Sequence, residues 1–338
     1  MKAVVCTKYG SPEVLQIKEY EKPVPKDNEV LIRIMATVAA PADSAFRMGK
    51  PVAARLFTGL SRPKHIPGDV LSGIIEAVGK DVKSFKAGDE VYGSSGTNFG
   101  TNAEYIVLPE DAALTIKPNN ISHGEAAAIS EGSLTALPLL RDTGKIKSGY
   151  KVLINGASGG VGVYAVQLAK YFGAEVTGVC GSSNVELVKR LGADKVIDYT
   201  KEDFAQKSDS YDIIFDAVGK NSFAHCKNVL LPCGVYMSTV PTFSLMLQTI
   251  FSSKSTGKKA VFAATGLRKP EEKRKDLVVL KDLIEAGKLL PVIDRKYSLE
   301  QISDAHSYVD TGHKKGSVAI TIQNCLDINT APLTNSTK

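Results

Sequence analysis

A glycine-rich turn between an apolar strand and a helix constrains this chain most. The segment reads KVLINGASGGVGVYAVQLAKYFGAEVTGVCGS and starts at Lys151. Its apolar residues predict a strand over Lys151–Asn155, a helix over Val161–Phe172 and a second strand over Glu175–Cys180. Glycines at 156, 159, 160 and 162 allow a tight turn, and the helix amino terminus offers unpaired N–H groups to a pyrophosphate. This order predicts a dinucleotide-binding unit, and a glycine turn that only packs the helix on the sheet is the alternative.

The residues after the second strand indicate which dinucleotide binds. An NAD site usually has Asp or Glu there, to bind the ribose hydroxyls. Here residues 180–184 read CGSSN, without an acidic residue, and Lys189 and Arg190 follow within two helical turns. Small hydroxyl and amide side chains leave room for a 2′-phosphate and can donate hydrogen bonds to it. This pattern favours NADPH, with NADH possible, and a purely structural helix cap is the alternative.

Strand and helix patterns divide the rest of the chain into two kinds of region. The first 120 residues predict short strands between Gly and Pro turns, including an alternating run from Val30 to Val38. Ser122 and Glu125 have the spacing of a capping box, and from there strands alternate with helices, as in a doubly wound parallel sheet. The other predicted strands are Lys2–Cys6, Val70–Val78, Glu90–Tyr92, Ala103–Leu108, Lys195–Asp198, Tyr211–Asp216, Gly234–Ser238, Ala260–Ala264 and Ser317–Ile322.

We therefore predict an α/β fold of two domains, which suits a chain of 338 residues at roughly 150 residues per domain. Residues 1–124 and 296–338 form the β-rich domain, and residues 125–295 form the parallel-sheet domain inserted into it. Ser298 and Gln301 repeat the capping-box spacing before a late helix. Residues 325–338 are polar without periodicity and predict a frayed tail.

Composition excludes several classes of function. The formal net charge of +6 comes without a dense basic cluster, so nucleic acid is not expected as a partner. No stretch approaches 18 apolar residues, which argues against a membrane span, and the start lacks the apolar core of a signal peptide. Five cysteines without close pairing indicate a reducing compartment, and we expect a cytoplasmic location. The apolar segment Phe243–Phe251 has three interpretations: a substrate cleft, a dimer surface or, least favoured, a membrane attachment.

Several segments together resemble the medium-chain dehydrogenase/reductase superfamily, in its zinc-free, zeta-crystallin-like quinone oxidoreductase branch. They cover nearly the whole chain and read MKAVVCTKYGSPEVLQI, VLIRIMATVAAPADSAFRMG, IPGDVLSGIIEAVGKDV, FKAGDEVYG, NGASGGVG, LGADKVIDYTKEDF, YDIIFDAVG and AHSYVDTGHKKGSVAI. The resemblance implies a GroES-like catalytic domain from both chain ends, a Rossmann domain between them and a coenzyme cleft where they meet. It also implies a homo-oligomer, a dimer formed through an edge strand.

The resemblance allows the zinc ligands of related dehydrogenases to be sought residue by residue. The first position falls at or near Ala39–Ala40, the second reads Gly68-Asp69 without His, and the third region offers Glu131 alone. A catalytic zinc needs about three protein ligands, so no metal is expected. A reaction without zinc favours acceptors already activated toward hydride, which are quinones and enones.

The family's coenzyme contacts fall at ten positions of this chain. Thr135 matches a position near the nicotinamide, and Val218 matches a contact to the ribose or nicotinamide. Lys315 matches a basic residue of the C-terminal loop, although Lys314 and Lys315 fit a solvated turn equally well. The others are the pyrophosphate turn Gly159, Gly160 and Val161, the 2′-phosphate loop Ser182, Ser183 and Asn184, and the adenosine-phosphate residue Tyr199. Relatives often have Arg or Lys where Ser183 stands, and Tyr199 can instead be a packing residue.

The residues around the reacting atoms leave the catalytic proton donor open. Relatives often have an asparagine where this chain has Ala40, so one polar contact is missing. Asp43 and Arg47 follow one helical turn apart and predict a salt bridge at a helix start. Four residues of a loop expected near the cleft are candidate donors, as are water and a ribose hydroxyl; the four are Tyr92, Ser94, Thr97 and Asn98.

These features predict a zinc-independent, NADPH-dependent reductase that transfers hydride to a quinone or an α,β-unsaturated carbonyl. Its partner is then a small-molecule acceptor. Two alternatives stay open. One is an enoyl-thioester or simple carbonyl reductase of the same fold, with Arg55, Arg62 and Lys64 as a candidate groove for thioester phosphates. The other is a non-catalytic member that binds nucleotide only.

Overall fold

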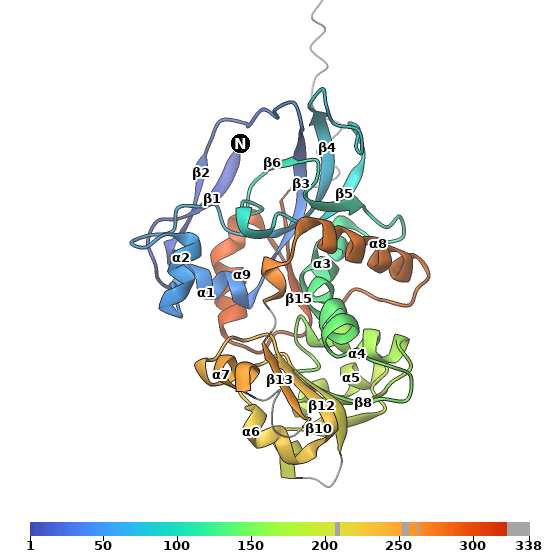
Figure 1. Cartoon of the computed structure of the whole chain (residues 1–338). Helices are drawn as coiled ribbons and strands as arrows, with labels where there is room; N and C mark the ends of the chain where they lie inside the picture. The colour runs from blue at the N-terminus through green and yellow to red at the C-terminus, as the bar shows by residue number, and fades with distance from the viewer. Residues whose placement is uncertain (207–209, 252–256, 263, 323–338) are drawn as a thin grey trace, which may run out of the picture.

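The computed structural model describes residues 1–206, 210–251, 257–262 and 264–322. The tail predicted over 325–338 therefore lies outside the described residues. Figure 1 shows the two larger sheets, one at the top and one at the bottom, with helices between them and around them. The α/β fold class with a doubly wound parallel sheet is confirmed.

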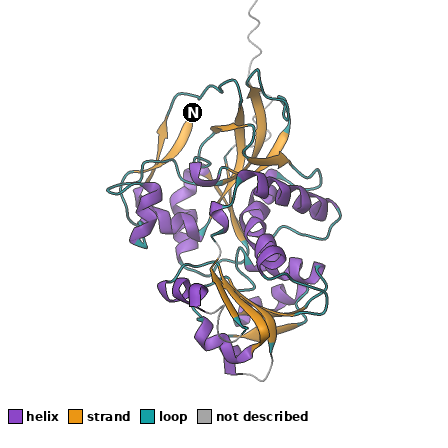
Figure 2. Cartoon of the chain, viewed as in Figure 1, coloured by secondary structure: helices purple, strands orange, loops and turns teal. Residues whose placement is uncertain are grey.

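The lower sheet in Figure 1 has six parallel strands in the order β10-β9-β8-β11-β12-β13. Its strands are β8 Lys151–Asn155, β9 Glu175–Cys180, β10 Lys195–Asp198, β11 Tyr211–Asp216, β12 Leu230–Ser238 and β13 Lys259–Phe262. Val152 and Ile154 pack in one apolar cluster and Leu153 packs in another, so the sheet is buried on both faces. Figure 2 shows helices on both sides of it: α4 Gly162–Tyr171, α5 Val185–Arg190, α6 Phe223–Cys226 and α7 Phe243–Phe251.

Strand order reverses between β8 and β11. From β8 the chain moves to β9 and β10 on one side, and it then returns to place β11 on the other side of β8. In doubly wound sheets, ligands bind beyond the carboxyl ends of the strands at such a reversal. The loops that follow β8 and β11 are therefore the candidate ligand-binding loops of this sheet.

The upper sheet is mixed, with strand order β14-β15-β3-β4-β5-β7, and β6 also pairs with β3. The longest strand, β3 Glu29–Ala39, is buried along most of its length because it has neighbours on both sides. The late strand β15 Ser317–Thr321 runs antiparallel to β3, so the two ends of the chain share one sheet. The remaining strands of this sheet are β4 Val70–Val78, β5 Glu90–Ser94, β6 Tyr105–Pro109, β7 Ala113–Ile116 and β14 Ile293–Ser298. Strands β1 Lys2–Cys6 and β2 Leu15–Glu19 pair with each other in a separate two-stranded sheet.

Helix α3, His123–Pro138, joins the two halves of the molecule. It contacts β3, β4 and β15 of the mixed sheet and α4 of the parallel-sheet side. Both halves of its predicted capping box are formed, because Glu125 N donates to Ser122 Oγ and Ser122 N donates to Glu125 Oε2. The other helices are α1 Pro41–Met48, α2 Arg55–Thr58, α8 Pro270–Glu285, which packs on β7 and α3, and α9 Ile302–Asp310.

Three strands, β2, β7 and β14, have no counterpart among the predicted strands. β14 begins at Ile293 and pairs with β15, so residues of the mixed sheet start a few positions before 296. The domain boundaries themselves stay a prediction.

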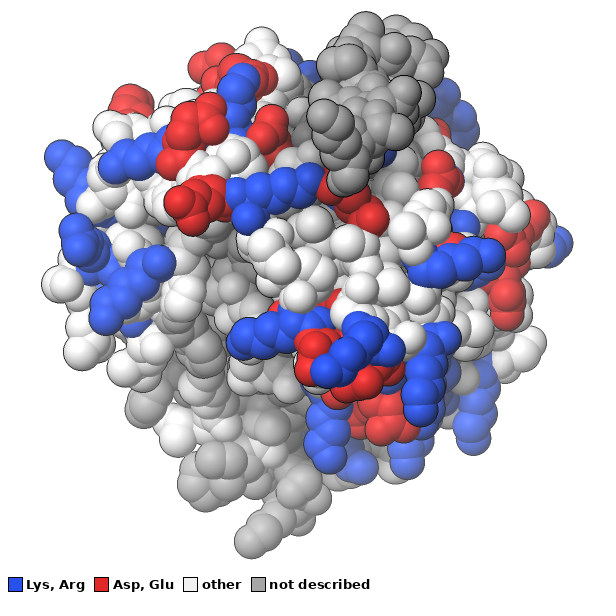
Figure 3. Space-filling view, turned by 90° about the horizontal axis from the view of Figure 1, so that it is seen from above, with Lys and Arg blue, Asp and Glu red and all other residues white. Residues whose placement is uncertain are grey.

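Among the described residues, no helix is both long and apolar enough to cross a bilayer. Figure 3 shows basic and acidic side chains interspersed over the face seen from above, rather than gathered by sign.

Candidate active site

The glycine turn lies at the carboxyl end of β8, at the reversal of strand order. Gly156 has φ +80°, and Gly159 N donates to Gly156 O at 3.0 Å. A side chain at Gly156 would overlap Val218, and one at Gly162 would overlap the Gly156 carbonyl. The turn therefore depends on glycine to let the start of α4 come close to the loop after β11. The amino terminus of a helix in such a turn suits an anion.

The loop after β11 is held against the glycine turn by one fully buried carboxylate, that of Asp216. Its Oδ1 accepts hydrogen bonds from Asn155 Nδ2 at 2.9 Å and from the N–H groups of Val218 and Gly219 at 3.0 Å. Its Oδ2 accepts from the Tyr236 hydroxyl at 2.8 Å. Burial, followed by this carboxylate, raises the pKa of Tyr236. The predicted contact residue Val218, 39% exposed, is thereby fixed beside the turn.

A lysine reaches the same turn from the mixed sheet. Gly316 N donates to Ser158 O at 2.8 Å, which ties the segment before β15 to the glycine turn. Lys314 is buried, its Nζ donates to Gly316 O at 2.8 Å, and a side chain at Gly160 would overlap that Nζ. The predicted residue Lys315 lies one position further on, where its N–H donates to Asp294 Oδ2 at 2.8 Å. The lysine whose ammonium is shown beside the turn is Lys314.

Helix α3 contributes the next side of the site. Thr135, predicted near the nicotinamide, accepts a 3.3 Å hydrogen bond from the Thr265 hydroxyl. One turn earlier, Glu131 Oε2 accepts from the Ser317 hydroxyl at 3.3 Å and lies next to Gly160. The glycine turn, α3 and the segment before β15 thus meet at one place, as Figure 1 shows for the elements.

Three carboxyl groups from the β-rich region and α3 influence one another here: those of Asp43, Asp69 and Glu131. Burial raises the pKa of Asp43, and the charges of Asp69 and Glu131 raise it further. Burial also raises the pKa of Asp69, against the nearby ammonium of Lys273. Both carboxyl groups therefore hold a proton to a higher pH than exposed aspartates do.

The salt bridge predicted between Asp43 and Arg47 is wrong. Asp43 Oδ2 instead accepts a 2.9 Å hydrogen bond from Ala40 N at the start of α1. Arg47 points to α9, where its Nη2 pairs with Asp310 and its Nε donates to Gly10 O at 3.2 Å. The pairing partner lies 263 residues away in sequence, so the local spacing could not indicate it.

The zinc positions sought from the family resemblance fall at or near Ala39–Ala40, at Gly68-Asp69 and at Glu131. Within the described ranges, no group of three or more His, Cys, Asp or Glu residues is placed to hold a metal ion. His65 packs on Phe99, with ring centroids 6.0 Å apart.

The candidate proton donors separate by environment. Tyr92 is fully buried and donates to Leu277 O at 2.7 Å, so its hydroxyl is committed to the core. Ser94 Oγ accepts from Gly96 N at 3.0 Å. Thr97 and Asn98 are exposed in the turn after β5. Tyr92 is therefore the least suited of the four.

The predicted 2′-phosphate loop lies beyond the carboxyl ends of β9 and β10. Asn184 Nδ2 donates to Ser158 Oγ at 3.1 Å, which links this loop to the glycine turn. Tyr199 is 60% exposed, and its hydroxyl lies against Gly181. Ser183 is exposed, whereas the Ser182 hydroxyl donates to the carboxylate of Asp198. Sequence reasoning singled out neither Asp198 nor Asp216, and it named Lys314 only as the neighbour of Lys315.

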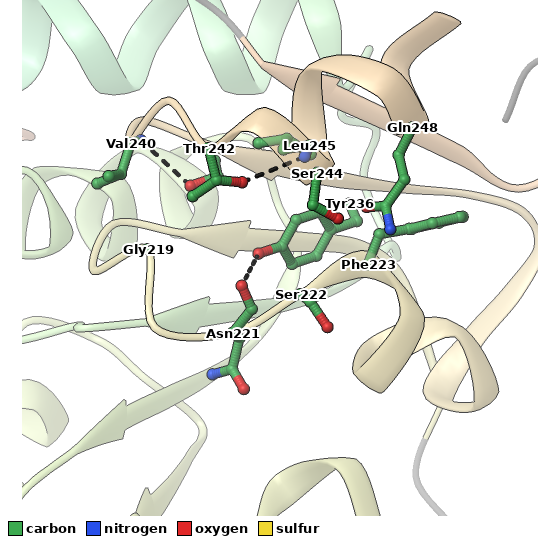
Figure 4. Close-up of a pocket in the computed structure, with 11 residues that line it drawn as sticks. Gly219, Asn221, Ser222, Phe223, Tyr236, Val240, Thr242, Ser244, Leu245 and Gln248 are labelled. Atoms are coloured by element: carbon green, nitrogen blue, oxygen red, sulfur yellow. Dashed lines mark hydrogen bonds between the residues drawn. The ribbon is translucent and has the colours of Figure 1, made fainter. Parts of the chain in front are cut away.

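A small recess lies beside the loop after β11, between that loop, β12 and α7. In Figure 4 the Tyr236 hydroxyl and Asn221 meet on one side of it, and Ser244 and Gln248 of α7 lie on the other. The segment Phe243–Phe251 is helical here, with Leu245 buried and Met246 and Leu247 exposed. Through Ser244, Leu245 and Gln248 this helix borders the recess, while the dimer interpretation stays open.

A doubly wound sheet with a glycine turn at its reversal, met there by residues of a second β-domain, defines a two-domain nucleotide-dependent enzyme. The model of the alcohol dehydrogenase GroES-like domain matches residues 26–118, and that of the zinc-binding dehydrogenases matches residues 191–320. The chain belongs to the medium-chain dehydrogenase/reductase superfamily, in its quinone oxidoreductase branch, and is an oxidoreductase. The predicted family and the GroES-like and Rossmann architecture are thus confirmed.

Individual relatives are similar over nearly the whole chain. A 2-methylene-furan-3-one reductase of Solanum lycopersicum is 35% identical over 334 residues, covering 95% of this chain and 79% of that protein. An NADPH-dependent alkenal/one oxidoreductase of Arabidopsis thaliana, a chloroplast protein, is 33% identical with the same coverage. The Escherichia coli quinone oxidoreductase, solved with NADPH, has a TM-score of 0.83 and 27% identity, covering 95% of this chain and all of that one.

Proposed function

We propose that this protein is an NADPH-dependent reductase that transfers hydride to a quinone or an α,β-unsaturated carbonyl without zinc. The observation that carries the proposal is the junction of the glycine turn, Lys314 and Val218 at the reversal of strand order. Support comes from the names of the relatives, which act on quinones, alkenals or a methylene-furanone.

The residues at the junction fit a nicotinamide dinucleotide. The turn Gly159–Val161, at the amino terminus of α4, would bind the pyrophosphate, and Lys314 would supply a positive charge there in addition to the predicted Lys315. Thr135 and Val218 would border the nicotinamide. Ser182, Ser183, Asn184 and Tyr199 would hold the adenosine end. When bound, the coenzyme supplies the hydride.

The remaining task of the protein is to orient the acceptor and to supply a proton. Orientation is the main contribution expected of the walls around Thr135 and Val218. Asp43 and Asp69, whose pKa values are raised, hold a proton close to α3 at mildly acidic to neutral pH. The raised pKa suits a carboxyl group that passes a proton on, directly or through water.

We also propose a homodimer and a cytoplasmic location. The dimer is supported by the position of β13 at one edge of the described parallel sheet. The location is supported by the free thiols of Cys6, Cys180, Cys226 and Cys233. Among the relatives are also mitochondrial and chloroplast proteins.

The test is the initial rate of NADPH oxidation with 1,4-benzoquinone and with a simple enone, in EDTA, with NADH in parallel. Turnover that persists in EDTA supports a zinc-free reductase. Activity that disappears in EDTA and returns with zinc contradicts it. Turnover only with an enoyl thioester would favour that alternative, and nucleotide binding without turnover would favour a non-catalytic member.

A further inference from the structure

The carboxylate of Asp198 lies at the adenosine end of the proposed coenzyme site, although no acidic residue follows β9. Asp198 is the last residue of β10 and pairs in register with Cys180, the last residue of β9. NAD-dependent folds place their ribose-binding acid at the end of this second strand. Here an acid stands one strand further along the same edge.

This carboxylate accepts hydrogen bonds from both neighbouring hydroxyl groups. The Ser182 hydroxyl donates to Oδ2, and the Thr200 hydroxyl and N–H donate to Oδ1 at 2.7 and 3.0 Å. The two hydroxyl oxygens lie 3.2 Å apart. A serine hydroxyl has one proton, so Ser182 cannot donate to a 2′-phosphate while it donates to Asp198.

The charge on Asp198 is permanent under assay conditions and only weakly balanced. The hydroxyls of Ser182 and Thr200 lower the pKa of Asp198 to about 2. Its one ion-pair partner among the described residues is Lys201, whose Nζ lies 3.5 Å from Oδ2 and whose side chain is 74% exposed. An exposed lysine at that distance offsets little of the charge.

We propose that Asp198 sets the coenzyme preference of this enzyme by disfavouring the 2′-phosphate, so that NADH is used alongside NADPH. The proposal rests on the proposed function, because it takes the coenzyme's adenosine end to lie at the Ser182–Asn184 loop. Asp198 acts in two ways: its charge repels the phosphate, and its hydrogen bond withholds the Ser182 proton. It is a specificity-determining residue and takes no part in hydride transfer.

The test compares kcat/KM for NADPH with kcat/KM for NADH in Asp198→Asn. An asparagine keeps the shape, removes the charge and can donate to the Ser182 oxygen, which frees the serine proton. We expect the NADPH-to-NADH ratio to rise about tenfold, the order of magnitude for one unit charge acting over several ångströms near a surface. Asp194→Asn, which removes a charge at the opposite end of β10, is the matched control and should change the ratio less than twofold.

A double-variant cycle separates the two effects of Asp198. Ser182→Ala alone should change the ratio less than twofold, because the serine proton is already committed. In the Asp198→Asn background, Ser182→Ala should remove part of the increase in the NADPH-to-NADH ratio. If Asp198→Asn does not fold, Ser182→Ala still decides: a tenfold loss of NADPH use would show that the hydroxyl already serves the phosphate, and would overturn the proposal.

Direct binding of adenosine 2′,5′-bisphosphate and of 5′-AMP distinguishes failure of this proposal from failure of the proposed function. Their affinity ratio should shift in Asp198→Asn by the same factor as the kinetic ratio. An unchanged ratio in a folded Asp198→Asn overturns the proposal, as does a wild-type protein that binds neither nucleotide. Nucleotide binding that shifts as expected, without turnover on any acceptor, keeps the proposal and removes the proposed function.

Discussion

At the residue scale, this site depends on side chains whose partners are distant in sequence. Lys314 lies next to Gly160, Asp198 accepts a hydrogen bond from the Ser182 hydroxyl, and Glu131 accepts one from the Ser317 hydroxyl. Each of these pairs joins different elements. Their chemistry therefore follows from tertiary placement, and single substitutions should separate them.

Lys314→Met should weaken binding of both nicotinamide coenzymes, because it removes a buried ammonium beside the pyrophosphate turn. The expected loss is about tenfold or more in affinity, the size of a charge-assisted hydrogen bond. Coenzyme dissociation constants measured by fluorescence titration give the answer, with Lys315→Met as the control. A larger loss of coenzyme affinity in Lys315→Met than in Lys314→Met would instead support Lys315, the residue predicted from sequence, as the coenzyme contact.

Asp43→Asn should flatten the dependence of stability on pH. The pKa of Asp43 is raised in the folded state, so the folded state binds more protons than the unfolded chain once the pH exceeds about 4. Stability is therefore lost as pH rises toward the folded pKa. Asparagine can still accept from Ala40 N but does not ionise.

The measurement is the free energy of unfolding in urea at about pH 5 and about pH 8. Wild type should lose more stability between the two pH values than Asp43→Asn does. The exposed Asp81→Asn should behave as wild type. Equal losses in wild type and Asp43→Asn would exclude Asp43 as a source of the pH dependence.

At the element scale, the loop after β11 is held in place by the Asp216 carboxylate at the end of the strand, rather than by hydrogen bonds among the loop's own residues. Asp216 binds the N–H groups of Val218 and Gly219 and also Asn155 of β8. These hydrogen bonds therefore connect the ends of β8 and β11 and the loop into one unit. Asp216 is a positioning residue, because it acts on the coenzyme through Val218.

Asp216→Ala should raise KM for the coenzyme about tenfold, since it leaves buried N–H groups without an acceptor and releases the loop. Asp216→Asn keeps an acceptor for both N–H groups and should restore most of the affinity. Tyr236→Phe, which removes only the far hydroxyl, should lower the melting temperature with little change in KM. Steady-state kinetics and thermal unfolding on the three variants check this. Equal KM changes in Asp216→Ala and Tyr236→Phe would assign Asp216 a purely structural role.

At the scale of the whole molecule, β13 lies at one edge of the described parallel sheet, and the proposed dimer would use this edge. Light scattering should give twice the chain mass of 36.1 kDa. Backbone amides of β13 should also exchange faster on dilution, because the edge strand loses its partner strand when the chains separate. A mass of one chain at every concentration would contradict the dimer.

Much of the architecture was accessible from sequence, because apolar strands such as β8 and β11 and the glycine turn carry local signals. β14 and β2 were missed because IDRKYS and LQIKE have few apolar residues. Lys314 and Asp198 could not be assigned from spacing. Lys314 depends on the pairing of Gly316 with Gly159, and Asp198 depends on β10 lying beside β9.

The pairing of β15 with β3 has a consequence for how the chain is made. The six strands of the parallel sheet lie within residues 151–262, so that sheet can assemble as soon as this stretch has left the ribosome. The mixed sheet must wait for β14 and β15, which are made after the whole parallel sheet, to join β3. Lys314 is made with them, so the nascent chain lacks this contact to its coenzyme while the parallel sheet is already formed.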